Sequence, residues 1–251
     1  NFRPVTTFPA FIDKSTLKRV IGLGADMIIV RELPGGIYFG KPQGRSEDGN
    51  TAYDSCVYSR YEIERVVRLA CDYAMSRTHK ITVVDKANVL ATSRLWRETA
   101  TETAKAYRDI TIDFMFVDNA AMQLILNPKR FDVIVTENMF GDILSDEASV
   151  ITGSLGLLPS ASVGLSTSVF EPIHGSYPQA AGKNIANPLG TILSAAMMFD
   201  LAFKLKEEAD VIKRAVEKSL EENIVTEDLD KTNPKSTSEV GDWIRDFILK
   251  K

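Results

Sequence analysis

Strand-like and helix-like segments alternate through the first three fifths of this chain. Residues 26–32 form an apolar run rich in Ile and Val, whereas residues 61–76 repeat apolar side chains at helical spacing. The first pattern predicts a buried strand and the second an amphipathic helix. The same reasoning predicts strands at residues 81–84, 110–117 and 131–135, and helices at 93–107, 118–126 and from 138 onward. Alternating strands and helices predict βα units and an α/β fold with a largely parallel sheet.

The remaining segments are predicted to be turns, loops and surface helices. Residues 35–40 read as a turn followed by a short strand, and the polar residues 41–50 as a mobile loop or arm. Towards the C-terminus, a buried helix is predicted at 192–203 and amphipathic helices at 208–222 and 238–249, the last capped by Ser238 with Glu239, with a linker at 228–236.

Composition excludes several classes of protein. The chain has 251 residues, 44% of them hydrophobic and 25% charged, which is typical of a globular protein with a sizeable core. The net charge of −4 and the absence of a basic cluster argue against binding of nucleic acid. No apolar run is long enough to span a bilayer, and no signal peptide is apparent. Cys56 and Cys71 are expected to be reduced thiols, so we expect a cytoplasmic protein without membrane contact.

Two aspartates mark the strand-to-helix segment at residues 135–146. Asp142 and Asp146 are four positions apart and share one face of the predicted helix, where like charges repel unless a cation lies between them. Carboxylates in this position suit Mg²⁺ or Mn²⁺; the plain alternative is a solvated acidic face. Apolar neighbours are expected to crowd the pair and favour the metal, namely Ile143, Leu144, Ala148 and Val150.

Polar residues follow several of the predicted strands. Arg31, Lys86, Asp118 and the Asp142 turn all lie at carboxyl ends of strands, where parallel sheets bind their ligands. This coincidence predicts one shared site. Lys86 can exchange a proton with a substrate, or be an ordinary surface lysine, and Arg31 can bind a carboxylate or pair with its neighbour Glu32.

Tyr38 is an ambiguous residue on the sequence alone, since it can be a proton donor or part of the core. Arg3, like Arg31, can clamp a carboxylate through two hydrogen bonds.

Small residues dominate two segments of the C-terminal part. Residues 153–164 and 174–179 let a ligand approach the backbone closely, and Asn187 followed by Pro188 predicts a helix start that favours phosphate. The alternative is that both are structural loops, with His174 satisfied within its turn. A Gly-x-Gly-x-x-Gly fingerprint after a strand is missing, which argues against a Rossmann dinucleotide site.

Several long motifs of this chain resemble those of the isopropylmalate/isocitrate dehydrogenase family of β-decarboxylating dehydrogenases. They comprise residues 1–4, 30–40, 84–90, the Asp142/Asp146 turn and residues 174–188. Gly-Gly-Ile-Tyr-Phe-Gly at 35–40 resembles the isopropylmalate branch. The resemblance implies a two-domain fold with a mixed, largely parallel sheet flanked by helices. It implies a substrate, metal and dimerisation domain at residues 1–152, and the C-terminal part of the cofactor domain at 153–251.

The resemblance also implies a role for each matching residue. Arg3 and Arg31 would bind substrate carboxylates, and Val89 would contact the substrate's alkyl group. Asp142 and Asp146 would bind Mg²⁺ or Mn²⁺, with Asp118 contributed by the partner subunit of a homodimer and also facing the substrate. Lys86, likewise from the partner, would assist removal of the hydroxyl proton, and Tyr38 would protonate the enolate carbon. Contacts to NAD are implied for Asn88, His174, Gly175, Ser176, Gln179 and Asn187.

The activity implied is NAD-dependent oxidative decarboxylation of 3-isopropylmalate to 4-methyl-2-oxopentanoate in leucine biosynthesis. The alternatives are a relative acting on tartrate, malate or homoisocitrate, and a non-catalytic regulatory member. Gln179 stands where NAD-dependent members usually carry an Asp, and its amide can still hydrogen-bond the ribose hydroxyls, so NAD is the expected cofactor. The family also has a segment before the position of Asn1, so we expect these 251 residues alone to be poorly active or inactive.

Overall fold

The computed structural model describes residues 1–15, 17–164 and 166–250 and contains two compact units. The first unit consists of Asn1 and residues 26–147, and the second of residues 2–25 together with the segment from Ala148 onward. The sequence analysis placed residues 2–25 in the first domain and the boundary after residue 152. The units differ from that division because the N-terminal strand pairs with a strand of the C-terminal part. The functional roles assigned to the two domains stay predictions.

A parallel sheet forms the centre of the first unit. Its strands are β2 (Asp26–Arg31), β5 (Lys80–Asp85), β6 (Thr111–Phe116) and β7 (Val133–Thr136), in the order β6-β5-β7-β2. Val135 on β7 lies opposite Val30 on one side and Val83 on the other, and all three are fully buried. Strands covered on both faces are apolar throughout, which explains why they could be recognised as continuous hydrophobic runs.

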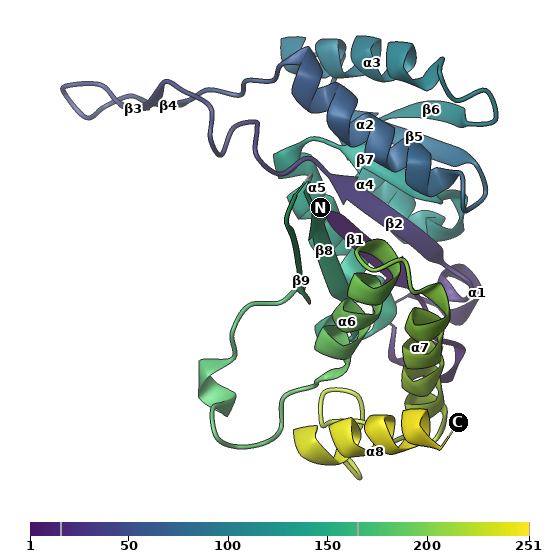
Figure 1. The fold of residues 1–251 in the computed structure, drawn as a ribbon. Coiled ribbons are helices and arrows are strands. Elements are labelled where there is room, and N and C mark those ends of the chain that lie inside the picture. The colour runs from purple at the N-terminus through teal and green to yellow at the C-terminus, as the bar shows by residue number, and fades with distance from the viewer. Residues whose placement is uncertain (16, 165, 251) are drawn as a thin grey trace. The chain divides into compact units, whose positions relative to one another are not determined.

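Helices cover both faces of this sheet. They are α2 (Arg60–Ala74), α3 (Ala91–Ala104), α4 (Val117–Leu126) and α5 (Asn138–Ser149). The chain moves in one direction across the sheet from β2 to β5 and β6, and then returns to β7. Right-handed crossovers therefore place α2 and α3 on one face and α4 on the other, as Figure 1 shows. All these strands and helices lie within a few residues of their predicted positions, so these predictions are confirmed.

One predicted strand of the first unit is wrong. Residues 34–39 form bends and turns instead of the short strand expected after Gly36, and the Gly40 N–H bonds to the Gly36 carbonyl at 2.8 Å. Gly36 adopts a φ of 81°, which favours glycine. The predicted arm is an antiparallel hairpin, β3 (Gln43–Arg45) with β4 (Ala52–Asp54), that extends away from the rest of this unit in Figure 1.

The second unit combines an antiparallel sheet with helices. Strands β1 (Phe2–Thr6), β8 (Pro159–Val163) and β9 (Ser168–Pro172) lie in the order β1-β8-β9. The longer helices are α6 (Leu189–Leu201), α7 (Lys206–Glu221) and α8 (Thr237–Leu249). Short helical turns connect these elements: η1 (Pro9–Lys14), α1 (Arg19–Gly22), η3 (Val150–Thr152), η4 (Leu155–Leu157) and η5 (Pro178–Ala180), with η2 (Pro128–Arg130) in the first unit.

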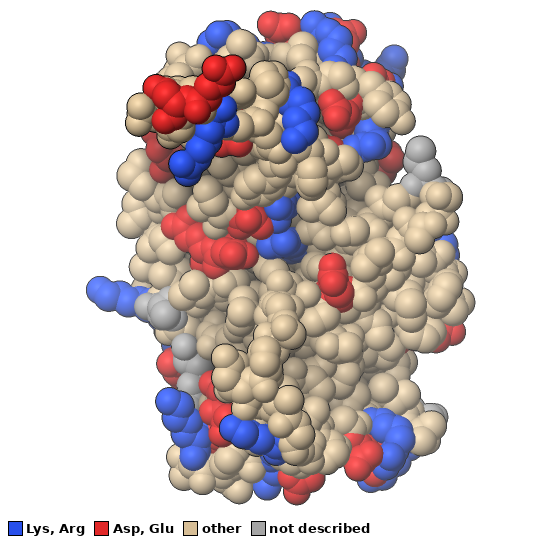
Figure 2. Space-filling model, turned by 90° about the vertical axis from the view of Figure 1, so that its left-hand side faces the viewer, with Lys and Arg blue, Asp and Glu red and all other residues tan. Residues whose placement is uncertain are grey.

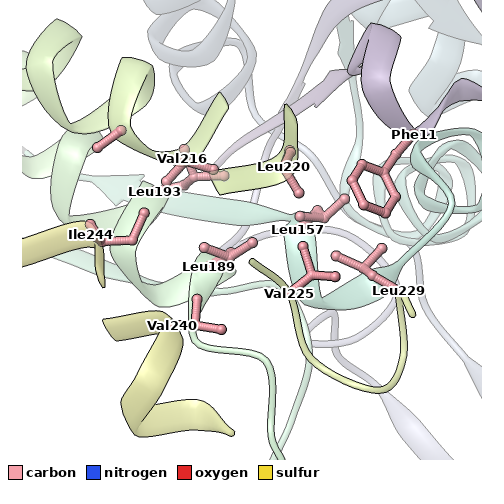
Figure 3. Close-up of a cluster of buried hydrophobic side chains, with 11 residues drawn as sticks. Phe11, Leu157, Leu189, Leu193, Val216, Leu220, Val225, Leu229, Val240 and Ile244 are labelled. Carbon is pink, nitrogen blue, oxygen red and sulfur yellow. The ribbon is translucent and has the colours of Figure 1, made fainter. Parts of the chain in front are cut away.

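A cluster of buried aliphatic side chains holds the second unit together (Figure 3). Leu189 and Leu193 of α6 meet Val216 and Leu220 of α7, and Ile244 contributes from α8. Full burial of one such side chain contributes about 1.5–3 kcal/mol, so this cluster fixes the three helices and the loops between them. The cap of α8 differs from the prediction, because Ser236 rather than Ser238 forms the capping box with Glu239.

The surface agrees with the composition. In Figure 2, Lys and Arg side chains are scattered among acidic ones, and among the described residues on that face they form no continuous basic surface. Cys56 and Cys71 are free cysteines, as expected. In the described part of the chain, no helix combines the length and apolar character that crossing a membrane requires.

Candidate active site

The carboxyl edge of the parallel sheet collects the residues predicted to share a site. Arg31 ends β2, Lys86 directly follows β5, Asp118 lies in the first turn of α4 after β6, and Asp142 lies in α5 after β7. Because the strands are parallel and paired in register, these ends meet at the same edge of the sheet. These residues therefore lie at one edge of the sheet, where they form two separate groups; one shared site stays a prediction.

Arg31, Asp142 and Tyr38 make up the first group. The Arg31 side chain is only 8% exposed, and its Nη1 forms an ion pair with Asp142 Oδ1. Tyr38 donates its hydroxyl to Asp142 Oδ2 at 3.2 Å, and the Arg31 guanidinium lies 6.0 Å from the Tyr38 ring centre. The alternative of an Arg31–Glu32 pair is wrong, since Glu32 pairs with Arg65 at 2.7 Å.

Tyr38 is placed to carry a proton. Its side chain is partly exposed, so a substrate can reach it. Partial burial, with the neighbouring Asp142 carboxylate, raises the pKa of the Tyr38 hydroxyl above its ordinary value. The phenol is therefore protonated at neutral pH, so it has a proton to donate, although the raised pKa makes it a weaker acid.

Lys86 and Asp118 make up the second group. Lys86 Nζ lies 2.6 Å from Asp118 Oδ1, and this hydrogen bond lowers the pKa of the Asp118 carboxyl. The backbone of Lys86 is fixed, because its N–H donates to Ser93 Oγ at 3.0 Å and its carbonyl accepts from Val89 N at 3.0 Å. The residues expected to act across a dimer thus form a pair of their own; their contribution to a partner's site stays a prediction.

The two α5 aspartates can supply hard oxygen ligands. Asp142 and Asp146 lie one helical turn apart, as expected. The expected apolar crowding is only half right: Leu144 and Ala148 are buried, but Ile143 and Val150 are exposed, as is Asp146. The reason is the helical period, which turns the two exposed residues away from the buried face.

A metal ion would need further ligands beyond this pair. Within residues 1–15, 17–164 and 166–250, no cluster of three or more His, Cys, Asp or Glu side chains could hold an ion. The two carboxylates fit part of the coordination sphere of Mg²⁺ or Mn²⁺, which binds oxygen ligands and retains water. Asp118, expected from the partner subunit, would be the third.

The second unit contains a pocket of about 910 Å³. It brings together the predicted cofactor residues His174, Gly175, Ser176 and Asn187, and the segment from Gly153 to Gly156. A pocket of this size accommodates a nucleotide.

The remaining predicted contacts are placed elsewhere. Gln179 lies exposed on η5 and is not among the residues lining the pocket, and Arg3 lies half-buried on β1. Asn88 and Val89 form an exposed turn after β5, in the first unit.

Asp228 organises one wall of the pocket. Its Oδ2 accepts hydrogen bonds from Asn187 Nδ2 at 3.0 Å and from Ser154 Oγ at 2.5 Å. Asn187 Oδ1 in turn accepts from Leu189 N at 2.9 Å, at the first residue of α6. The N-cap position of α6 is Pro188, one residue later than predicted, and its side chain makes no capping hydrogen bond. A Cβ on Gly156 would lie 2.7 Å from the Asn187 Cβ, so this position requires glycine.

The sequence analysis missed two sets of residues. Residues 228–236 were interpreted as a linker, yet Asp228, Lys231 and Pro234 line the pocket. Tyr58, Glu137 and Asn138 form a buried polar layer behind Arg31. Two consecutive polar residues directly after a buried strand were the one available signal for the second set.

Known proteins resemble the chain over nearly its whole length. The family model described as isocitrate/isopropylmalate dehydrogenase matches residues 1–244. The chain is 55% identical over 252 aligned positions to a 3-isopropylmalate dehydrogenase of Bacteroides fragilis, covering 100% of this chain and 70% of that protein. It is 53% identical to a 3-isopropylmalate dehydrogenase of Geobacillus kaustophilus, covering 99% of this chain and 68% of the relative.

A solved structure agrees with the fold. The crystal structure of isocitrate dehydrogenase from Methylococcus capsulatus superposes with a TM-score of 0.89 at 37% sequence identity, covering 98% of this chain and 72% of that one. This match supports the α/β architecture predicted from the alternation of strands and helices. The chain belongs to the isocitrate/isopropylmalate dehydrogenase family.

Proposed function

We propose that this chain carries out the NAD-dependent oxidative decarboxylation of 3-isopropylmalate to 4-methyl-2-oxopentanoate, in leucine biosynthesis. The relatives that it matches at 53–55% identity bear the name of that enzyme. The observation that carries the proposal is the group of Arg31, Tyr38 and Asp142 at the carboxyl edge of the sheet. Arg31 offers a cation for a substrate carboxylate, Tyr38 a proton donor and Asp142 a metal ligand, and the three side chains are in contact.

Substrate binding rests on the two arginines. Arg31 is almost buried and held in place by Asp142 and Asn138, so its guanidinium is pre-organised to bind a carboxylate through two hydrogen bonds. Arg3 would bind a carboxylate as well. Val89, with an exposed apolar side chain, would contact the isopropyl group.

Proton transfer rests on Lys86 and Tyr38. Lys86, ion-paired with Asp118, would relay the substrate's hydroxyl proton while hydride leaves for NAD⁺, because its ammonium group can pass one proton to Asp118 or water as it receives the other. Tyr38, which keeps its proton at neutral pH, would protonate the substrate carbon from which CO₂ has departed. A divalent cation held by Asp142, Asp146 and the partner subunit's Asp118 would lower the pKa of the substrate hydroxyl and offset negative charge.

The cofactor would occupy the pocket of the second unit. His174, Gly175, Ser176 and Asn187 line that pocket, and their polar side chains and backbone amides suit the phosphates and ribose of NAD. Gln179 and Asn88 are not among the residues that line this pocket, so their contacts with NAD rest on the family resemblance alone. We further propose a cytoplasmic homodimer with shared active sites, because Lys86 and Asp118 would serve the partner's metal site.

An assay of the complete natural protein tests this function. With NAD⁺ and Mn²⁺, we expect turnover of 3-isopropylmalate far above that of malate, tartrate or homoisocitrate, and slower turnover with NADP⁺. Preferred turnover of another 2-hydroxy acid would assign the protein to a different member of the family. The absence of turnover with all four acids, together with binding of one of them, would support a non-catalytic role.

A further inference from the structure

We propose that Asn138 is a positioning residue, which fixes both the substrate arginine Arg31 and the turn that carries Tyr38 relative to helix α5. The inference rests on the proposed function for the meaning of those two residues, but not for the contacts themselves. Asn138 is fully buried, and it touches none of the reacting groups proposed above. Its effect would pass through its hydrogen bonds.

The side-chain oxygen of Asn138 holds the arginine. Oδ1 accepts from Arg31 Nε at 2.9 Å and from Arg31 Nη2 at 2.7 Å. Nη1 of the same guanidinium forms the ion pair with Asp142. Two edges of the guanidinium are thereby anchored to the first two turns of α5, so the orientation of Arg31 is set by this helix.

The side-chain nitrogen of Asn138 holds the turn before Tyr38. Nδ2 donates to the Leu33 carbonyl at 2.6 Å and to the Gly35 carbonyl at 2.9 Å. Gly35 stands three residues before Tyr38, and Gly40 N bonds back to the Gly36 carbonyl to close the turn. The amide group therefore connects the segment that presents the proton donor to the helix that carries Asp142.

All four hydrogen-bonding sites of this amide are in use. An asparagine side chain offers two donors and two acceptor lone pairs. Here they meet two N–H groups of one arginine and two backbone carbonyls. A rotated amide would point its N–H groups at the guanidinium and its oxygen at the carbonyls, so only one orientation is possible.

The backbone of Asn138 is fixed from behind. Its N–H donates to the Tyr58 hydroxyl at 2.9 Å, and the Tyr58 hydroxyl donates to Glu137 Oε2 at 3.1 Å. Glu137 Oε1 accepts from Phe140 N at 2.9 Å, which satisfies another N–H group at the start of α5. Tyr58 and Glu137 are both buried, so this layer holds Asn138 at one position.

Two substitutions at residue 138 separate the two contacts of the side chain. Asn138→Ala removes both, so we expect kcat/KM to fall about 10- to 100-fold, with a higher KM from a displaced Arg31 and a lower kcat from a displaced Tyr38. Asn138→Asp keeps an acceptor for Arg31 but loses both donors to the carbonyls of Leu33 and Gly35. We therefore expect Asn138→Asp to retain a KM close to that of the wild type and to lose mainly kcat.

Hydrogen exchange provides a readout that is independent of turnover. In Asn138→Asp, we expect the Gly36 and Gly40 amides of the turn to exchange faster than in the wild type. Asp132→Asn is the matched control, because it also removes buried hydrogen bonds but lies at the opposite edge of the sheet. This control should lower the melting temperature while leaving KM, kcat and exchange at the turn unchanged.

Three outcomes would overturn the inference: wild-type kinetics in Asn138→Ala, an equal rise of KM in both variants, or unchanged exchange at the turn. Failure of the wild-type protein to oxidise 3-isopropylmalate would contradict the proposed function instead. The exchange measurement would then still decide whether Asn138 holds the turn. If Asn138→Ala does not fold, the near-isosteric Asn138→Asp carries the test.

Discussion

The two edges of the parallel sheet in the first unit carry similar residues in different environments. At the amino edge, Arg77 pairs with Asp132 at 2.5 Å and with Asp26 at 3.0 Å. The backbone N–H of Thr78 donates a further hydrogen bond to Asp132 Oδ2 at 2.9 Å. The Asp132 side chain is 7% exposed, so its hydrogen bonds are made within the protein.

At the carboxyl edge, the carboxylates of the two candidate groups remain reachable, although Arg31 itself is buried. The side chains of Asp142 and Asp118 are 38% and 62% exposed, although each is paired with a basic residue. Behind them lies the buried layer of Tyr58, Glu137 and Asn138. Ion pairs of the same residue types thus stabilise the fold at one edge, and at the other they present groups that a substrate or metal can engage. Exposure, rather than residue type, separates the two roles.

The largest effect should come from the carboxyl edge and appear only in activity. Replacing Lys86 by Met removes the proposed proton relay, so kcat should fall about 10²- to 10⁴-fold. The melting temperature should change little, because Lys86 Nζ forms a partly exposed ion pair. Steady-state kinetics with calorimetry measure both. A normal kcat in Lys86→Met would contradict the functional role assigned to the ion pairs at the carboxyl edge.

The next effect should come from the amino edge and appear only in stability. Asp132→Asn breaks the pair with Arg77 in a mostly buried site, which should cost about 3 kcal/mol of unfolding free energy. Urea denaturation followed by circular dichroism measures this loss. KM and kcat of the folded variant should match those of the wild type, and a specific loss of turnover would show that the two edges are coupled.

The pH dependence of stability should have opposite signs at the two edges. Burial raises the pKa of Asp132, but the hydrogen bonds from Thr78 and Arg77 outweigh it, so its pKa is lowered overall. Its stabilisation is therefore present above the unfolded pKa of about 3.9 and is lost as the pH falls through the folded value. At the carboxyl edge, burial raises the pKa of Glu137, so protonation in mild acid favours the folded state.

Unfolding free energies measured from pH 3 to pH 7 test these signs. Asp132→Asn should lose less stability in acid than the wild type does, relative to its own value at pH 7. Glu137→Gln should lose more, because it lacks the residue whose protonation favours folding. Parallel pH profiles for the two variants and the wild type would contradict the assignment.

The smallest effect should come from the residue next to Tyr58. Ser59 caps α2 in a capping box with Glu62 and belongs to no contact of the buried layer. Ser59→Ala should cost about 1 kcal/mol of stability and leave turnover unchanged. The matched variant Tyr58→Phe should reduce turnover, because it removes the hydroxyl that joins Glu137 to the Asn138 N–H. Equal activity losses in both variants would show that turnover depends on the stability of α2 and not on the Tyr58 hydroxyl.

Much of the fold follows from local patterns in the sequence. The strands β2, β5, β6 and β7 and the helices between them were predicted because burial imposes an apolar period that is visible within one segment. Arg31, Lys86, Asp118 and Asp142 lie at one edge of the sheet, as predicted, because parallel strands bring their carboxyl ends together. The predicted strand after Gly36 is wrong because the chain turns there, with Gly36 at a φ of 81° and a hydrogen bond from Gly40 N to the Gly36 carbonyl. The predicted cap at Ser238 is wrong because Ser236, two positions earlier, forms the capping box.

Only the tertiary structure decided which polar residues support the site. Arg31 and Asn138 are 107 positions apart, and Tyr58 bonds to a backbone group 80 positions away. Likewise, Asp228 accepts a hydrogen bond from Asn187, 41 positions away. The segment interpreted as a linker therefore lines the pocket. Periodicity reports which side of an element is buried, whereas a hydrogen bond depends on the distance between two atoms. That distance is set by packing between elements, which no single segment of sequence contains.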